Sequence, residues 1–294
     1  MSAFRCGTVA IAGRPNTGKS SLLNKLIGHK IAIVSPKAQT TRHTVTGILT
    51  TPDCQYVFVD LPGYQTRHMN VLNRALNRQA TEGARDCDVV VFVVEALRYA
   101  AADREVLARI PAAQSVVVAV NKIDLVKNRL ELLPFLERLQ KEREFAAIVP
   151  VSARKGKNLA ELLRVVAGLL PAGPAAYPAA QLTDKDERFF AAEILREKLF
   201  QLLGEELPYR CDVALESFKQ EGRLRRIEAT VWVERDSQKP IVIGAKGELL
   251  KRISSAARKD MERLFGGKVY LGVWVKVKRD WTGDERLLRQ LGYR

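Results

Sequence analysis

The sequence predicts an α/β domain with a mostly parallel sheet, followed by a smaller α+β domain. Short β-branched apolar runs alternate with amphipathic stretches as far as Leu170, a pattern typical of parallel strands covered by helices on both faces. The segment Pro171–Pro178 then places three prolines within eight residues, and a different order of elements begins after it. A length of 294 residues also favours about two domains.

The strands expected in the first domain, residues 1–171, are apolar at every position, as strands buried on both faces are. They are Thr8–Ala12, Tyr56–Val59, Val89–Val94, Val116–Val120 and Ile148–Val151. The amphipathic stretches around them predict helices over Lys19–Ile27, Asn73–Glu82, Arg104–Ile110, Leu130–Lys141 and Ala160–Leu170.

Residues 172–184 are expected to form a semi-rigid linker, because prolines neither continue a helix nor join the interior of a sheet. Residues 185–294 then predict the order α-β-β-α-α-β. The expected elements are a helix over Arg188–Leu203, strands over Asp212–Phe218 and Arg226–Glu234, a strand-to-helix element at Val242–Ile243, a helix from near Glu248, and a strand over Val269–Val277.

The net charge of +15 indicates an anionic partner, for which nucleic acid and an acidic membrane surface are the two main candidates. Residues 1–171 carry 24 Lys and Arg against 14 Asp and Glu, and residues 172–294 carry 24 against 19. The second domain is therefore only weakly basic, and a nucleic-acid site on it has to be a local patch.

Cysteine spacing and apolar runs favour a reduced, cytoplasmic chain. The four cysteines lie far apart, and no pair of them has zinc-ligand spacing. No basic leader precedes a long apolar core, and runs such as Val89–Val94 are far shorter than the roughly 20 residues that cross a bilayer.

The run from Gly13 to Ser20 fits G-x-x-x-x-G-K-[ST] between an expected strand and an expected helix. Glycines let the backbone wrap a phosphate chain, and successive N–H groups then point inward to bind it. Lys19 is placed to bridge the β- and γ-phosphates, and the Ser20 hydroxyl to bind Mg²⁺. The predicted nucleotide contacts of this loop are Gly13, Arg14, Pro15, Asn16, Thr17, Gly18, Lys19, Ser20 and Ser21.

Base selection is predicted at Asn121, Lys122, Ile123 and Asp124, directly after an expected strand. The Asp124 carboxylate can accept hydrogen bonds from the N1–H and 2-amino groups of guanine, whereas adenine would leave it unpaired. Ser152 and Ala153 follow the next expected strand and can offer a backbone N–H to the guanine O6.

Two further segments complete the predicted nucleotide site. In the turn Asp60, Leu61, Pro62, Gly63 and Tyr64, Asp60 is expected to hold Mg²⁺ through water and the Gly63 N–H to contact the γ-phosphate. In the polar segment 38–42, a threonine hydroxyl is expected on Mg²⁺ when the γ-phosphate is present. We favour Thr41 over Thr40, so the predicted metal set is Ser20, Thr41 and Asp60, and the predicted catalytic set is Lys19, Thr41, Asp60 and Gly63.

This ordered series resembles the translation-associated GTPases of the Era/TrmE branch, and over nearly the whole chain it resembles Era-type members. The resemblance extends to E-L-P-Y (Glu206–Tyr209), V-I-G-x-K-G (Val242–Gly247), W-V-K-V-K (Trp274–Lys278) and L-G-Y (Leu291–Tyr293). It implies a P-loop GTPase domain followed by a KH type II domain, with hydrolysis of GTP to GDP and phosphate.

The residue after Gly63 affects the expected rate. Ras-like enzymes have a water-orienting glutamine there, whereas this chain has Tyr64, as Era-type GTPases do. A tyrosine has no side-chain amide to orient water, so we expect slow turnover, on the order of 10⁻² s⁻¹ or below. Asn16 is a candidate ligand for K⁺, as in some relatives with P-N-x-G-K-S.

An RNA site is predicted at Gly244–Gly247, because a G-x-x-G turn between helices clamps about four unpaired nucleotides in KH domains. Lys246 adds charge to the turn, and Arg258 and Lys259 lie further along. Ile241 and Ile243 are equally compatible with a base-lined groove and with the core. The predicted RNA-binding residues are Ile243, Gly244, Ala245, Lys246, Gly247, Lys251 and Arg252.

The resemblance, rather than spacing or composition, implies the remaining partners. These are single-stranded RNA near the 3′ end of 16S ribosomal RNA, the small (30S) ribosomal subunit during assembly, and peripheral contact with the inner membrane. It also implies a cytoplasmic protein with a membrane-associated fraction and a link to cell growth and division, and no DNA partner is expected.

We interpret the chain as a GTP-dependent RNA-binding switch, in which GTP and Mg²⁺ order residues 37–43 and 60–65. One alternative is a constitutive RNA-binding module whose nucleotide domain only stabilises the fold. Another is a membrane-linked signalling GTPase for which RNA is incidental. Phosphate release that depends on Lys19, and a comparison of liposome binding with RNA binding, separate these alternatives.

Overall fold

The computed structural model describes residues 3–37, 40–64, 70–204 and 206–290. Contacts divide the chain into two units. The first contains residues 1–34, 41–69 and 73–184, and the second contains 35–40, 70–72 and 185–294. Several sequence expectations lie outside the described residues, namely those on Ala38 and Gln39, on Gln65, and on the L-G-Y sequence at 291–293.

The first unit contains a six-stranded sheet in the order β2-β3-β1-β4-β5-β6. Every neighbouring pair is parallel except β2 and β3, which are antiparallel. The mostly parallel sheet is therefore confirmed. The strands are β1 (Arg5–Ala12), β2 (Val45–Thr50), β3 (Cys54–Asp60), β4 (Val89–Glu95), β5 (Ser115–Asn121) and β6 (Ala147–Pro150).

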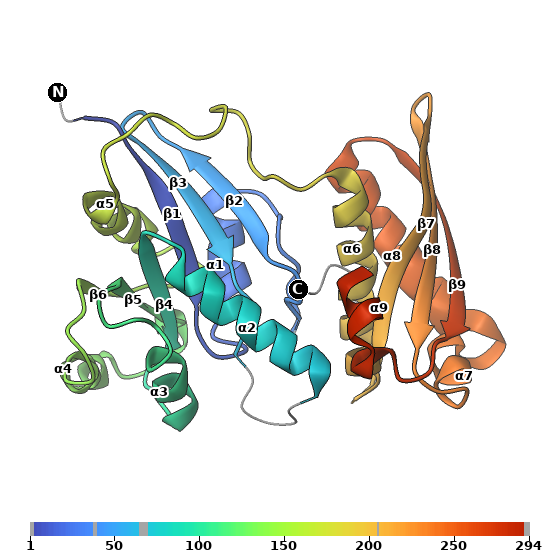
Figure 1. Ribbon diagram of the computed structural model, residues 1–294, viewed down its shortest axis with the longest axis horizontal. Helices are drawn as coiled ribbons and strands as arrows, with labels where there is room; N and C mark the ends of the chain where they lie inside the picture. The colour runs from blue at the N-terminus through green and yellow to red at the C-terminus, as the bar shows by residue number, and fades with distance from the viewer. Residues whose placement is uncertain (1–2, 38–39, 65–69, 205, 291–294) are drawn as a thin grey trace. The chain divides into compact units, whose positions relative to one another are not determined.

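Helices cover both faces of this sheet (Figure 1). Buried side chains of α2, α3 and α4 pack with Val90, Phe92 and Val118 in one cluster, whereas α1 and α5 lie against the other face. The helices are α1 (Lys19–Ile27), α2 (Val71–Arg85), α3 (Ala101–Leu107), α4 (Leu132–Gln140) and α5 (Leu159–Leu169), with short 3₁₀ turns at Ile123–Leu125 and Arg129–Glu131.

Two differences from the sequence-based elements have local causes. Strand β2 was not predicted, because this half-buried edge strand contains Gly47 and therefore lacks a continuous apolar run. Helix α3 begins three residues earlier than predicted, at Ala101. The Asp103 carboxylate accepts the Ala100 N–H at 2.9 Å and so caps the helix at that point.

The proline-containing segment 172–184 is held along the sheet of the first unit. Ala172 pairs with Arg5 and Thr183 pairs with Gly47 as isolated bridges. The buried Gln55 side chain accepts the N–H groups of residues 176 and 177 at 2.8 and 2.9 Å. We keep 172–184 as our proposed boundary between two domains, with the segment itself packed on the first.

The second unit has the order α-β-β-α-α-β, and its elements form a three-stranded sheet with α6 and α8 packed against it. Strands β7 and β8 are antiparallel, and β8 and β9 are parallel. Its core joins Leu195, Ile227, Ile253 and Met261. The elements are α6 (Glu187–Leu202), β7 (Cys211–Glu221), β8 (Leu224–Val233), α7 (Gln238–Ile243), α8 (Glu248–Phe265), β9 (Lys268–Val277) and α9 (Glu285–Gln290), with 3₁₀ turns at Leu207–Arg210, Ala245–Gly247 and Trp281–Gly283.

Two expectations for this unit need correction. Val242–Ile243 is not a strand-to-helix element, because both residues end helix α7, with Val242 buried in the core. Helix α9 was not predicted. It follows a turn in which the fully buried Trp281 donates its indole N–H to the Arg210 carbonyl at 3.1 Å, a contact between distant parts of the chain.

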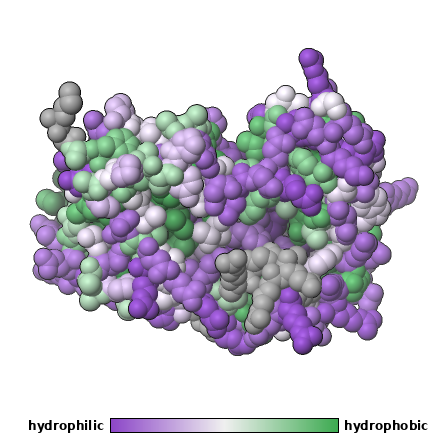
Figure 2. All heavy atoms as spheres, turned by 45° about the horizontal axis from the view of Figure 1, so that its top comes forward, coloured by the Kyte–Doolittle hydropathy of each residue, from purple (hydrophilic) through white to green (hydrophobic). Residues whose placement is uncertain are grey.

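Hydrophilic residues cover most of the face shown in Figure 2, and apolar residues are scattered between them. Among the described residues, no helix is both long enough and apolar enough to cross a membrane.

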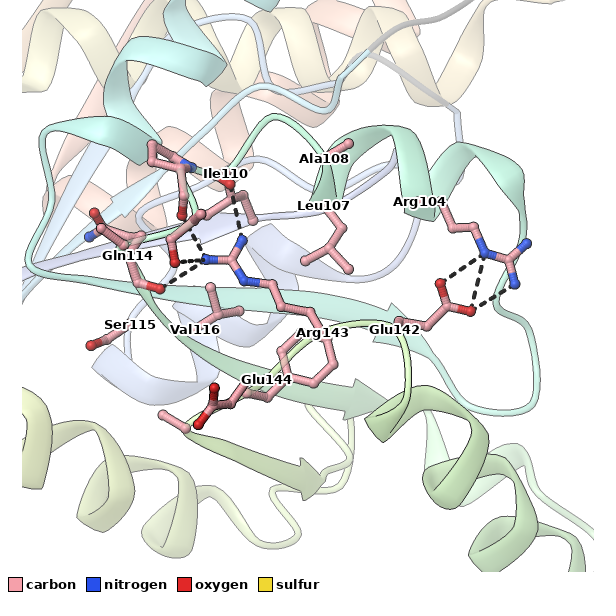
Figure 3. A pocket seen from close by; sticks show the side chains of 15 residues that line it. Arg104, Leu107, Ala108, Ile110, Gln114, Ser115, Val116, Glu142, Arg143 and Glu144 are labelled. Carbon is pink, nitrogen blue, oxygen red and sulfur yellow. Dashed lines mark hydrogen bonds and ion pairs between the residues drawn. The ribbon is translucent and has the colours of Figure 1, made fainter.

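A hollow of about 730 Å³ lies where β5 begins, lined by residues of α3, the loop before β5 and the segment before β6 (Figure 3). The Arg143 guanidinium points into it and donates to the carbonyls of Ile110, Pro111, Ala112 and Gln114 at 2.6–3.1 Å. Since these carbonyls already accept hydrogen bonds from the Arg143 guanidinium, we assign the hollow a structural role in closing the loop before β5.

Candidate functional site

The loop between β1 and α1 has a backbone that only glycine allows at its two ends. Gly13 has φ 151° and Gly18 has φ 97°. A Cβ atom on Gly13 would lie 2.4 Å from the Val93 carbonyl oxygen, and one on Gly18 would lie 2.4 Å from Asn121 Nδ2. The glycines are therefore required both by the left-handed backbone and by close packing against two neighbouring strands.

Lys19 begins α1 with its ammonium held inside the loop. The residue is 6% exposed, and Nζ donates to the Gly13 and Arg14 carbonyls at 3.0 and 3.1 Å. Burial lowers the pKa of Lys19 to about 8, although Asp60 opposes the shift, so the side chain is mostly charged at pH 7. An ammonium at the opening of a ring of N–H groups can pair with phosphate oxygens.

Three oxygen-bearing side chains meet beside this loop. Ser20 Oγ donates to Asp60 Oδ2 at 2.7 Å and lies 2.9 Å from Thr41 Oγ1. Asp60 is fully buried, its Oδ1 has no hydrogen-bond partner, and burial raises its pKa to about 6. Two hydroxyls and a carboxylate with an unsatisfied oxygen are the hard ligands that Mg²⁺ takes, so the residues present fit that ion.

The two candidate threonines have different surroundings. Thr41 belongs to the oxygen cluster, whereas Thr40 donates its hydroxyl to the Lys37 carbonyl at 2.8 Å. This arrangement favours Thr41 as the proposed metal ligand.

The turn after Asp60 lies against the phosphate loop. A Cβ atom on Gly63 would be 3.1 Å from Pro15 Cγ and 3.2 Å from Lys19 Nζ. The absence of a side chain therefore lets the Gly63 backbone approach the point where a terminal phosphate would meet Lys19.

In the predicted base-selecting motif, Asn121 has a structural role that the sequence did not indicate. Its side chain donates to the Thr17 carbonyl at 2.8 Å and accepts the Ala153 N–H at 2.9 Å, which ties together three loops. Asp124 Oδ1 accepts the Ser152 hydroxyl at 2.5 Å, and the Ser152 N–H donates to the Lys157 carbonyl. A contact from Ala153 to a base would therefore have to share its N–H with Asn121.

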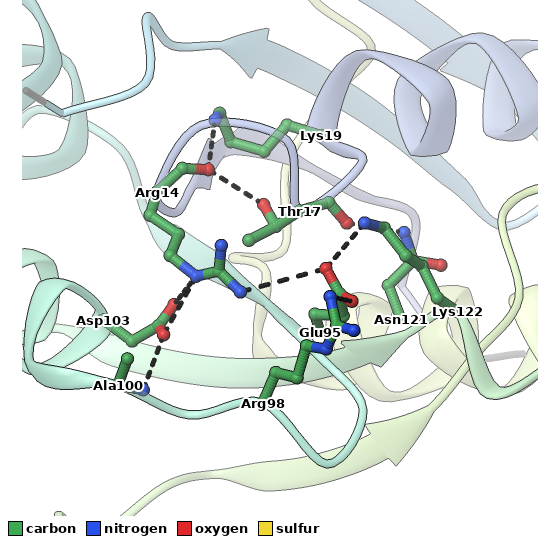
Figure 4. Close-up of polar contacts among 9 residues, drawn as sticks. All are labelled: Arg14, Thr17, Lys19, Glu95, Arg98, Ala100, Asp103, Asn121 and Lys122. Carbon is green, nitrogen blue, oxygen red and sulfur yellow. Dashed lines mark hydrogen bonds and ion pairs between the residues drawn. The ribbon is translucent and has the colours of Figure 1, made fainter. Parts of the chain in front are cut away.

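Two acidic residues of the site were missed by the sequence reasoning (Figure 4). Asp103 is fully buried and accepts Arg14 Nε at 3.0 Å with both oxygens. Glu95 lies 3.8 Å from Arg14 Nη2 and 2.7 Å from Lys122 Nζ. Glu95 is the last residue of β4. Because ligands bind at the carboxyl ends of parallel strands, this position could have indicated Glu95 from the sequence. Asp103 lies in no motif.

The predicted RNA-binding turn also depends on left-handed backbone. Gly244, Lys246 and Gly247 have φ values of 75°, 50° and 79°, and a Cβ atom on Gly244 would lie 2.5 Å from Leu249 Cβ. Lys246, Lys251 and Arg252 are exposed around the turn and on the first part of α8. The turn thus places two glycines, which have no side chain, beside exposed cations, an arrangement that suits a sugar-phosphate chain.

The apolar residues beside this turn divide between surface and core. Ile241 is 58% exposed, whereas Ile243 packs against the core of the second unit. Of the two, the geometry favours Ile241 as a surface for bases.

Family models match both parts of the chain. Residues 8–122 match a 50S ribosome-binding GTPase family, and residues 206–282 match the KH domain family. The chain is 54% identical to GTPase Era of Chromobacterium violaceum over 98% of both chains. It is also 54% identical to GTPase Era of Neisseria meningitidis, over 98% of this chain and 95% of that protein.

Two solved structures are similar over 99% of both chains, each at 37% identity. One is a tyrosine-to-alanine variant of Era from Aquifex aeolicus bound to GDP and aluminium fluoride, with a TM-score of 0.95. The other is Era in complex with the GTP analogue GDPNP, Mg²⁺ and a fragment of 16S ribosomal RNA, with a TM-score of 0.94.

We predict that Asp103→Asn lowers the unfolding free energy by about 1–2 kcal/mol, because Arg14 then loses a buried charged partner. Glu161→Gln is the matched control. It removes a carboxylate whose pair with Arg164 is largely exposed, and we expect a change below about 0.5 kcal/mol. Denaturant titration measures both values, and equal effects of the two substitutions would contradict the assigned role of Asp103.

Proposed function

The chain belongs to the Era family of GTPases, and from that premise we propose how its own residues bind nucleotide and RNA. It is a GTP hydrolase with a P-loop GTPase domain and a KH domain. We propose that GTP or GDP binds with its phosphates along the loop from Gly13 to Gly18 and its guanine at Asp124. The observation that supports this most strongly is the cluster of Ser20 and Thr41 with the buried Lys19 and Asp60, which has the charges and hard oxygens that a Mg²⁺–triphosphate requires.

Mg²⁺ is the proposed cofactor, held by Ser20, Thr41 and Asp60, and when bound it neutralises charge on the β- and γ-phosphates. Lys19 is proposed to bridge the same phosphates. The Gly63 N–H is proposed to contact the γ-phosphate, which only GTP carries. Asp60 must lose its proton to serve as a ligand, and its pKa of about 6 allows this at neutral pH.

Slow intrinsic turnover remains our expectation, because Tyr64 cannot orient water through an amide. K⁺ at Asn16 also remains a proposal, supported by the left-handed backbone of Asn16 within the phosphate loop (φ 64°). Equal hydrolysis rates in potassium and sodium buffers would argue against it.

We propose single-stranded RNA near the 3′ end of 16S ribosomal RNA as the ligand of the turn Gly244–Gly247. The solved Era complex with a 16S fragment supports this choice of RNA. The exposed cations around the turn support Gly244–Gly247 as the position where the RNA binds. From this follows the proposed role in assembling the 30S subunit, with a link to growth and division and with no DNA partner.

A cytoplasmic location with a peripheral inner-membrane fraction completes the proposal. The net charge of +15 supports electrostatic contact with anionic lipid, which salt should weaken.

Contacts of the segment Ser35–Thr40 support control of RNA binding by nucleotide. This segment belongs to the second unit. Within that unit Arg196 Nη1 donates to the Thr40 carbonyl at 2.5 Å, and Lys37 Nζ donates to the Leu203 carbonyl. The next residue, Thr41, is a proposed Mg²⁺ ligand. Movement of Thr41 on nucleotide exchange would therefore pull on a segment anchored to α6.

We predict that Asp124→Asn weakens GTP binding by about 10²-fold or more and favours xanthosine triphosphate, whose 2-carbonyl can accept from the new amide. Asp53→Asn, an exposed change far from the motif, serves as the control and should leave base preference unchanged. Competition binding with the two nucleotides measures the preference. Unaltered selectivity in Asp124→Asn would refute the assignment of guanine to this residue.

Lys246→Glu is expected to weaken RNA binding about 10-fold, since it reverses a charge beside the phosphates, while GTP binding stays unchanged. Lys219→Glu makes the same charge change at an exposed position of β7 and should have little effect. A titration of labelled single-stranded RNA compares the two. If both variants bind alike, the turn is not the RNA site.

Protein loaded with a non-hydrolysable GTP analogue is expected to bind this RNA at least about 5-fold more tightly than protein loaded with GDP. By linkage, RNA must then tighten binding of the GTP analogue by the same factor. Equal RNA affinity in the two nucleotide states would be compatible with both proposed binding sites but would contradict control of RNA binding by nucleotide.

A further inference from the structure

The side chain of Tyr64, the residue after Gly63, is held by the apolar core of the first unit. It packs partly buried against the cluster formed by α2, α3, β4 and β5. Tyr64 lines a narrow seam with Leu61, Ala84 and Val106, and with Gly13 at its inner end. The seam has room for about one water molecule (20 Å³), so the ring fills a packing site rather than a ligand site.

Arg109 covers this ring. Its guanidinium carbon lies 4.0 Å from the centre of the Tyr64 ring, well within the range of cation–π attraction. Arg109 follows the last turn of α3, where its backbone N–H donates to the Val106 carbonyl at 3.1 Å. The exposed Arg109 side chain is thus carried by the turn that follows α3, a helix whose first turn holds Arg14 of the phosphate loop through Asp103.

The position of Tyr64 determines that of the preceding residue. A Cβ atom on Gly63 would lie 3.2 Å from Lys19 Nζ and 3.1 Å from Pro15 Cγ, so the Gly63 N–H can meet a γ-phosphate only if the turn keeps this close approach. Anchoring of the adjacent Tyr64 side chain in this core restricts that backbone. We propose that Arg109 is a positioning residue for GTP hydrolysis, which holds Tyr64 in the seam and thereby keeps the Gly63 N–H at the terminal phosphate.

This inference rests on the proposed nucleotide site and makes a narrower claim. GDP has no γ-phosphate, so an anchor that acts through Gly63 affects GTP binding and hydrolysis without affecting GDP binding. General damage to the loop would instead weaken both nucleotides together.

The test compares Arg109→Ala with Arg109→Lys in the full-length protein. Single-turnover hydrolysis and the affinities for GDP and GDPNP are measured for each. Because Arg109 is exposed, we expect Arg109→Ala to lower the hydrolysis rate and the GDPNP affinity about 2- to 5-fold each, with GDP affinity within about 1.5-fold of the unmodified protein. Arg109→Lys keeps a cation over the ring and should restore most of both losses. Arg138→Ala, which removes an arginine from the exposed face of α4, should change none of the three values.

A double-mutant cycle tests the route through the ring. In a Tyr64→Ala background, Arg109→Ala should have no further effect, whereas Tyr64→Phe keeps the ring and should preserve the effect of Arg109. The proposal is overturned if Arg109→Ala leaves hydrolysis unchanged or speeds it, if it weakens GDP and GDPNP equally, or if its effect persists without the Tyr64 ring. Failure of the nucleotide site itself would be recognised separately, by normal GDP binding in Lys19→Ala.

Discussion

A phosphate site made of backbone N–H groups, as we propose for the loop from Gly13 to Gly18, requires a loop shape that brings like dipoles together, and several contacts within the first unit hold that shape. Gly13 and Gly18 allow the loop to pack against Val93 and Asn121 without side chains. The Asn121 amide holds the Thr17 carbonyl, and Asp103 holds Arg14 with both carboxylate oxygens. The loop is therefore held by contacts with three elements: strand β4, the base-selecting motif at Asn121, and helix α3.

Burial of opposite charges prepares the same site for a charged ligand. Lys19 and Asp60 are both buried, and in each case burial shifts the pKa toward the neutral form. Such groups are costly unless they are paired, and here the pairing is incomplete, because one oxygen of Asp60 has no partner. The proposed Mg²⁺–triphosphate would supply the missing charges of both signs, so we expect part of its binding free energy to come from relieving this cost.

The two units contain the same backbone feature, which we propose binds phosphate groups of different kinds. In each, glycines with positive φ precede a helix, at Gly18 before α1 and at Gly247 before α8. The first loop is held by the buried Asp103 and Asn121, which suits the compact phosphate chain proposed for it. The second is exposed and flanked by cations, which suits an extended chain. Helix α3 and the turn after it link two of these contacts, because Asp103 accepts from Arg14 of the phosphate loop and Arg109 covers the Tyr64 ring.

The sequence by itself determined the apolar strands, the α-β-β-α-α-β order of the second unit and the motifs at Lys19, Asp60, Asp124 and Gly244, because each depends on local spacing. Tertiary structure decided what depends on contacts between distant residues. Strand β2 forms by pairing with β3, Thr41 rather than Thr40 meets Ser20, and Asn121 ties loops together. Glu95, Asp103 and Arg109 lie in no motif and acquire their roles only through the residues that folding brings beside them. A backbone pattern can be predicted from neighbouring residues in the chain, whereas a charge pair or a ring contact is defined only when the partner is in place.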